Sequence, residues 1–100
     1  MVLTKDTRWW IAFDLEQLTN AEFKEFREYL DTADEAQKKM RKLFFGSASD
    51  RAGDLLGAAQ RRYQTIQELR LPDGHNKLVW QIERLETLVA ELNKEEEADV

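Results

Sequence analysis

Residues 15–30 have the sequence LEQLTNAEFKEFREYL, which contains a helix-start signal followed by large apolar residues at helical spacing. Thr19 and Glu22 fit a capping box, in which the threonine hydroxyl and the glutamate carboxylate pair with backbone N–H groups at a helix start. Phe23, Phe26 and Leu30 then recur on one side of the helix. This stretch therefore predicts that a helix begins at about residue 20.

Three other parts of the chain carry helical signals. An aromatic segment, Thr7–Leu18, precedes the first stretch, and a segment with small and apolar residues, Asp50–Arg70, follows it. Leu71-Pro72-Asp73-Gly74 stops that segment, because proline disfavours helical geometry in the residue before it and Asp-Gly favours a turn. The last segment is His75–Glu96.

The segment Asn20–Phe45 is expected to turn one apolar stripe inward. The stripe consists of Phe23, Phe26, Leu30, Ala33, Met40 and Phe44. Thr32 and Glu35 repeat the capping-box spacing inside the segment, which leaves open whether it forms one helix or two. Gly46 suits the position after a helix end, and Ser47 or Ser49 suits the start of the next helix.

The last segment has the clearest pattern. Its apolar residues follow a 4-3-4-3 spacing, which is typical of the seam of a helical bundle; they are Leu78, Ile82, Leu85, Val89 and Leu92. Residues 95–100 are acidic and predict a disordered tail. The sequence therefore predicts one all-α domain over residues 1–94, a compact bundle of four to five helices with long amphipathic helices.

The composition limits the classes of function. The 100 residues include 20 acidic and 15 basic side chains, for a formal net charge of −5 and a pI of 4.9. This balance argues against nucleic acid as a partner, since such proteins present a basic face. The chain has no cysteine, which excludes disulfides and thiolate metal sites. No segment has the length and apolar character of a signal peptide or a membrane span, so we expect a cytoplasmic protein without a membrane partner.

Residues that carry out chemistry are scarce in this chain. His75 is the single histidine, and it lies in a turn sequence where histidines usually cap or contact solvent. The glycine-containing stretch 53–57 lacks the lysine and serine that follow in a phosphate-binding loop. We therefore expect no enzymatic activity, no catalytic residue, no cofactor and no bound metal.

Two groups of basic residues are candidates for contacts with a partner. The first consists of Lys38, Lys39, Arg41 and Lys42, and the second of Arg61 and Arg62. The net charge favours another interpretation of the first group, a solvated face where cations complement the helix dipole.

The tryptophans are further candidates for contacts with a partner. Trp80 lies away from the seam of its helix, and an exposed indole is typical of a binding anchor. Trp9 and Trp10 belong to the first segment and are expected either to cover Trp80 in the core or to form one exposed apolar patch with it.

One sequence pattern resembles the junction of the first and second helices in pyrin domains and, more loosely, in other death-fold domains, including bacterial death-like adaptors. The pattern is Leu15-Glu16, Leu18-Thr19, Glu22-Phe23-Lys24, Phe26-Arg27 and Leu30, about a sixth of the chain. The resemblance implies homotypic assembly through complementary charged faces, in which the cluster Lys38–Lys42 meets an acidic face of a neighbouring molecule. The chain departs from the pyrin pattern in its middle segment and in its long last helix.

These observations predict a non-catalytic protein–protein interaction module, which binds another protein or acts as a self-associating adaptor. One alternative is a small acidic helical inhibitor, a viral protein or mobile-element product that acts on a host defence or nucleic-acid-handling protein through its acidic faces. A second alternative is a helix-turn-helix regulator, for which Arg61 and Arg62 supply the basic residues.

Overall fold

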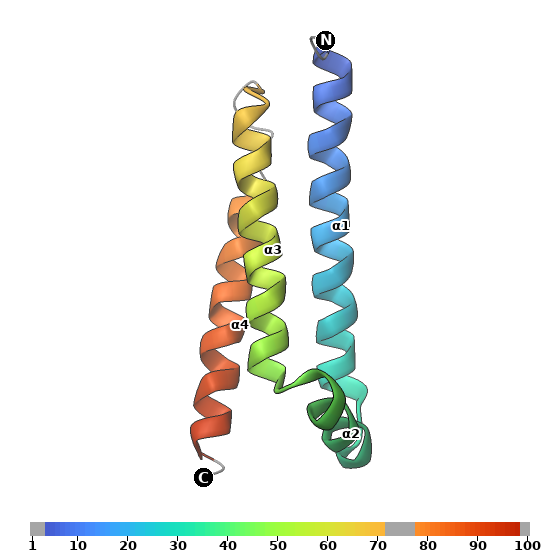
Figure 1. Ribbon diagram of the computed structural model, residues 1–100, viewed down its shortest axis with the longest axis vertical. Coiled ribbons are helices and arrows are strands. Elements are labelled where there is room, and N and C mark those ends of the chain that lie inside the picture. Colours follow the sequence, from blue (N-terminus) through green and yellow to red (C-terminus); the bar gives the residue numbers. More distant parts are fainter. Residues whose placement is uncertain (1–3, 72–77, 99–100) are drawn as a thin grey trace.

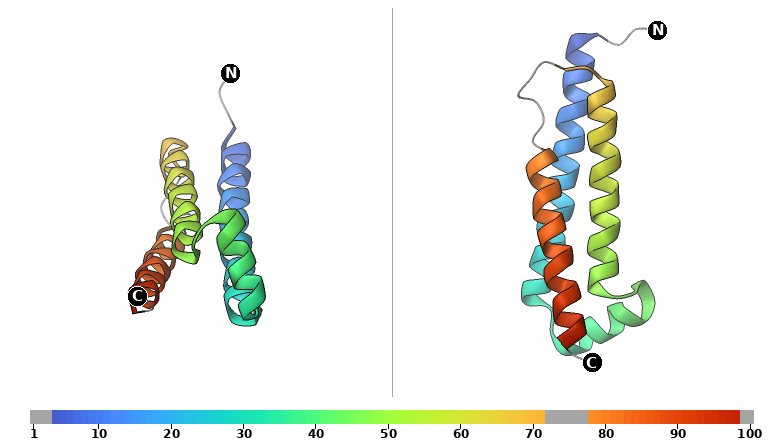
Figure 2. Two further views of the ribbon diagram at one scale, coloured as in Figure 1. Left: turned by 60° about the horizontal axis from the view of Figure 1, so that its bottom comes forward. Right: turned by 90° about the vertical axis from the view of Figure 1, so that its left-hand side faces the viewer.

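The structure is a computed structural model that describes residues 4–71 and 78–98 (Figure 1). It contains four α-helices and no strand within these ranges: α1 (Lys5–Thr32), α2 (Glu35–Phe45), α3 (Ala48–Glu68) and α4 (Leu78–Ala98). The helices α1, α3 and α4 lie side by side along an axis of 52 Å, with α3 antiparallel to the other two, whereas α2 lies across one end (Figures 1 and 2). The prediction of an all-α bundle is confirmed.

Helix α1 is continuous, so the prediction of two helices separated near residue 19 is wrong. The Thr19 hydroxyl donates a hydrogen bond to the carbonyl oxygen of Leu15, at 2.9 Å, and thus lies inside a helix instead of capping one. Neither glycine nor proline interrupts this region, and buried Ala12, Thr19 and Phe26 continue one inward face along the helix. The capping-box spacing is therefore present at Thr19 without a helix start, because packing along that face favours continuation.

Helix α1 ends at Thr32 and α2 begins at Glu35. The sequence had left open whether this region forms one helix or two. Asp34 caps α2: its side chain accepts from the Gln37 backbone N–H at 2.8 Å, and the Gln37 side chain accepts from the Asp34 backbone N–H at 3.0 Å. The capping pair is thus Asp34 and Gln37, two positions after the expected pair of Thr32 and Glu35. Gly46 ends α2 with φ of 85°, and Ser47 caps α3.

The core is formed by α1, α3 and α4. Ala52 and Ala59 on α3 are fully buried, which lets the neighbouring helices approach closely. The seam predicted for α4 is confirmed, since its leucines are buried and its other two members are half-buried. Two apolar clusters result: one contains Phe26, Ala52, Leu88 and Leu92, and the other contains Ala12, Ile66 and Leu78.

Two further expectations are wrong, one about exposure and one about disorder. Met40 and Phe44 were expected in the inward stripe, but both are exposed, because the break at residues 33–34 separates α2 from the register of α1. The disordered tail was expected over residues 95–100, but α4 continues to Ala98, and residues 99–100 lie outside the described ranges. The Glu96 carboxylate accepts hydrogen bonds from the Ser49 backbone N–H (3.1 Å) and hydroxyl (2.7 Å), so it anchors this end of α4 at the N-terminus of α3.

Replacing Gly53 by alanine is expected to stabilise the domain. A Cβ built at Gly53 has no heavy atom within 4 Å, so the helical propensity of alanine, worth about 1 kcal/mol over glycine, is gained without a clash. Thermal unfolding should show a rise in Tm of about 4–8 °C. Gly46→Ala is the opposite control and should lower Tm, because φ of 85° strains any residue with a Cβ. An unchanged or lower Tm for Gly53→Ala would contradict the expectation.

Candidate functional site

Helix α2 presents an apolar face to solvent. Met40, Leu43 and Phe44 fall on one side of the helix at about 100° per residue. All three are largely exposed, Leu43 to 84%, and α2 contributes no buried residue to the core. An apolar face of this kind is typical of a surface that another molecule covers. We call these three residues the α2 face.

The basic side of α2 is turned toward the end of the bundle. Lys38, Arg41 and Lys42 line a cavity of about 280 Å³ that also contacts Tyr29 and Leu92. The guanidinium carbon of Arg41 lies 4.3 Å from the centre of the Tyr29 ring, a cation–π contact. Three of the four residues of the first basic group, Lys38, Arg41 and Lys42, therefore line a cavity of their own molecule. Lys39, one helical turn before Leu43, lies outside this cavity lining.

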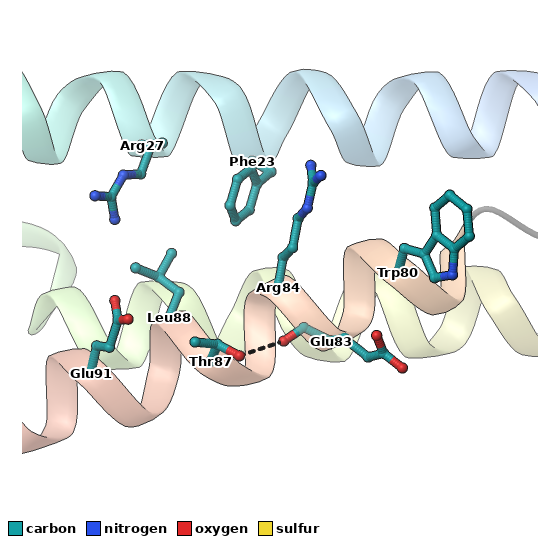
Figure 3. Close-up of a pocket in the computed structure, with 8 residues that line it drawn as sticks. All are labelled: Phe23, Arg27, Trp80, Glu83, Arg84, Thr87, Leu88 and Glu91. Carbon is teal, nitrogen blue, oxygen red and sulfur yellow. Dashed lines mark hydrogen bonds between the residues drawn. The ribbon is translucent and has the colours of Figure 1, made fainter.

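A second candidate surface is a groove between α1 and α4 (Figure 3). The groove has a volume of about 670 Å³, and α3 lies behind it. Its apolar part consists of Phe23, Leu88 and the exposed indole of Trp80. Its charged and polar part consists of Arg27, Glu83, Arg84, Thr87 and Glu91. The groove exists because α4 packs mainly on α3 and contacts α1 less closely.

Trp80 lies at one end of this groove and is 69% exposed, so the interpretation in which Trp9 and Trp10 cover it in the core is wrong. Trp9 and Trp10 instead form an aromatic cluster with Phe13 on α1. The rings of Trp9 and Phe13 stack at 5.4 Å, and Trp10 meets both of them edge-on. Trp10 is exposed and Trp9 is half-buried, so this cluster is a separate apolar surface near the start of α1.

The side chain of Arg62 contacts residues of α1 and is not a freely exposed surface side chain. Its guanidinium forms an ion pair with Glu22 and donates a hydrogen bond to the Thr19 hydroxyl at 3.0 Å. These contacts join α3 to α1, so the structure does not support Arg62 as a partner-binding residue. Arg61 remains exposed on α3. Thr19 and Glu22, the two residues expected to cap a helix, act together here as the acceptors for one arginine.

The sequence prediction missed both the α2 face and the groove. A detectable signal for the α2 face was present, since residues 35–45 taken alone form a strongly amphipathic helix between a capping box and a glycine. The groove had no such signal, because it depends on how closely α1 and α4 approach.

Comparisons with known proteins add no family assignment: no family model, no curated protein and no solved structure matches this chain. Among residues 4–71 and 78–98, no helix has the length and apolar character needed to cross a membrane. The same residues contain no cluster of three or more histidine, cysteine, aspartate or glutamate side chains that could hold a metal ion.

Proposed function

We propose that this protein is a non-catalytic protein–protein interaction module that binds its partner through the α2 face. The observation that supports the proposal is the exposure of Met40, Leu43 and Phe44 on a helix that buries nothing in the core. Exposed apolar side chains lower solubility unless a partner covers them, and α2 has no role in packing that would explain them. We place this interaction in the cytoplasm, which a chain without cysteine permits.

An anionic membrane surface is a less suitable partner for α2. A lipid-binding helix of this type carries basic residues around its apolar face. Here Lys38, Arg41 and Lys42 border the cavity on the protein side. The acidic end of α4 also lies at the same end of the molecule as α2 and would be repelled by anionic headgroups (Figure 1).

The two alternatives from the sequence differ in how the structure supports them. A helix-turn-helix regulator needs an exposed recognition helix, whereas α3 packs on both α1 and α4, and its Arg62 pairs with Glu22. An acidic inhibitor is a special case of the interaction module with a basic partner. The observation that favours it is the charge of α4, which has six glutamates against Arg84 and Lys94.

A photo-reactive amino acid placed at Leu43 tests the proposal in the cells that produce the protein. We expect a discrete covalent adduct with another polypeptide after illumination, because Leu43 is the most exposed residue of the α2 face, at 84%. The same amino acid at Gln60, an exposed position on α3, is the matched control and should give no adduct. The absence of an adduct at position 43, with the protein folded and illuminated, would contradict the proposed function.

A further inference from the structure

We infer that the groove between α1 and α4 binds the α2 face of a second copy of this chain. The inference rests on the proposed function, since it names the partner of the α2 face. It also assigns a role to Trp80, which lies in the groove and has no part in the core.

The two surfaces match in length. Helix α2 has 11 residues, which corresponds to about 16 Å at the rise of an α-helix. The groove follows α4 from Trp80 to Glu91, eleven residue steps and thus also about 16 Å. An α2 helix laid along α4 would therefore occupy the whole groove, as in other complexes in which an amphipathic helix fills an apolar groove between helices.

The two surfaces also match in chemistry. Met40, Leu43 and Phe44 would contact the apolar part of the groove, where Trp80 offers the large, accessible ring that is typical of an interface anchor. Helix α2 carries four basic residues and one acidic residue, a net charge of +3. Helix α4 carries six acidic and two basic residues, a net charge of −4. The groove lining itself is neutral, with Arg27 and Arg84 against Glu83 and Glu91, so the opposite net charges of the two helices favour the encounter of the molecules and do not define a pairing inside the groove.

The molecule's own α2 cannot reach the groove. Phe45 is joined to Ala48 by two residues, which span at most about 11 Å between these Cα atoms. The start of α3 is held beside Glu96 by the Ser49 hydrogen bonds. Trp80 lies 16 residue steps from Glu96 along α4, about 24 Å away. An α2 that filled its own groove would place either Phe45 or Glu35 near Trp80. Phe45 is kept away by the connection to Ala48. Glu35 is kept away by the two-residue connection to Thr32, because α1 runs past Arg27 to its end on the side of the groove opposite Trp80. The α2 face that fills the groove therefore belongs to another molecule.

This contact differs from the assembly implied by the resemblance to pyrin domains. There, the cluster Lys38–Lys42 meets an acidic face directly. Here, Lys38 and Lys42 border the cavity of their own molecule, and the apolar α2 face makes the contact. The contact also joins two unlike surfaces, so each molecule offers one helix and one groove.

Two variants with complementary defects test the inference. The face variant carries Leu43→Glu and Phe44→Glu, and the groove variant carries Thr87→Arg, which places a long basic side chain in the groove and repels α2. Trp80→Ala is a second groove variant. All of these positions are exposed, so thermal unfolding should show that each variant remains folded. Gln60→Arg, on the exposed side of α3, is the matched control.

Sedimentation velocity over a concentration series gives the readout. We expect the unmodified protein and the Gln60→Arg control to self-associate, and each variant alone to associate at least tenfold more weakly. An equimolar mixture of the face and groove variants should form a one-to-one complex, because the intact α2 of one fits the intact groove of the other.

The possible failures separate the inference from the proposed function. An unmodified protein that stays monomeric at all concentrations overturns the inference. A mixture that stays monomeric while the unmodified protein associates also overturns it, since this result indicates contact between identical faces. If position 43 then crosslinks to a different polypeptide, the proposed function stands without the inference, whereas no adduct and no self-association would overturn both.

Discussion

Replacing Leu85 by aspartate is expected to abolish the cooperative fold. Leu85 is 1% exposed and is one of the two largest fully buried side chains among the described residues. Removing a buried leucine side chain costs about 2–5 kcal/mol, and the aspartate would in addition place an unpaired carboxylate in the core. Together these costs are comparable to the whole stability of a small domain, about 5–15 kcal/mol. Circular dichroism during heating should show no cooperative transition.

Leu43→Asp is the matched control, because it makes the same chemical change at a leucine that is 84% exposed. Its Tm should stay close to that of the unmodified protein, since α2 buries nothing in the core. If Leu85→Asp unfolded at the same temperature as Leu43→Asp, Leu85 would not lie in the core of the bundle. Loss of the transition in both variants would instead mean that the α2 face is covered within the monomer.

Replacing Arg62 by methionine is expected to destabilise the domain by about 2 kcal/mol, which corresponds to a fall in Tm of roughly 10 °C. The side chains of Arg62 and Glu22 are 19% and 31% exposed, so the pair is mostly shielded from solvent. The methionine would leave Glu22 without its cation and the Thr19 hydroxyl without the hydrogen bond from Arg62. Thermal and urea unfolding measure the loss.

A double-mutant cycle with Glu22→Gln separates this ion pair from general packing effects. The two single changes should be less than additive when combined, because each removes the same contact. Asp31→Asn is the matched control: it removes the exposed Arg27–Asp31 pair, which spans 3.7 Å within one helix, and should cost less than about 0.5 kcal/mol. Additive effects of Arg62→Met and Glu22→Gln would show that the pair does not join α1 to α3.

Local sequence signals predicted correctly those parts of the fold in which residues close in sequence cap a helix end or share one helix face. The connector at Gly46 and Ser47 requires a positive φ and a capping hydroxyl, and both appear in the sequence at those positions. The leucine seam of α4 follows from helical periodicity alone. The break near Asp34 was recognisable for the same reason, although the capping pair shifted by two positions, from Thr32 and Glu35 to Asp34 and Gln37.

The wrong predictions concern residues whose partners lie far along the chain. Thr19 and Glu22 have the hydrogen-bonding groups of a capping box, but Arg62, more than 35 residues away, takes up both in an α1–α3 contact. Glu96 was predicted to belong to a disordered acidic tail, but its carboxylate accepts a hydrogen bond from the Ser49 hydroxyl. A local pattern shows which hydrogen bonds a side chain is able to make, and distant segments determine which of them form.

The sequence by itself determined that the chain is helical, where most of its helices end and which α4 side chains are buried, because helical periodicity and capping depend on residues within a few turns. Only the tertiary structure decided which apolar faces remain uncovered. Helix α2 has the apolar stripe of a core helix, yet the two-residue connections at its ends direct that stripe to solvent. The groove beside Trp80 likewise arises because α4 packs more closely on α3 than on α1, a distance that no local pattern encodes.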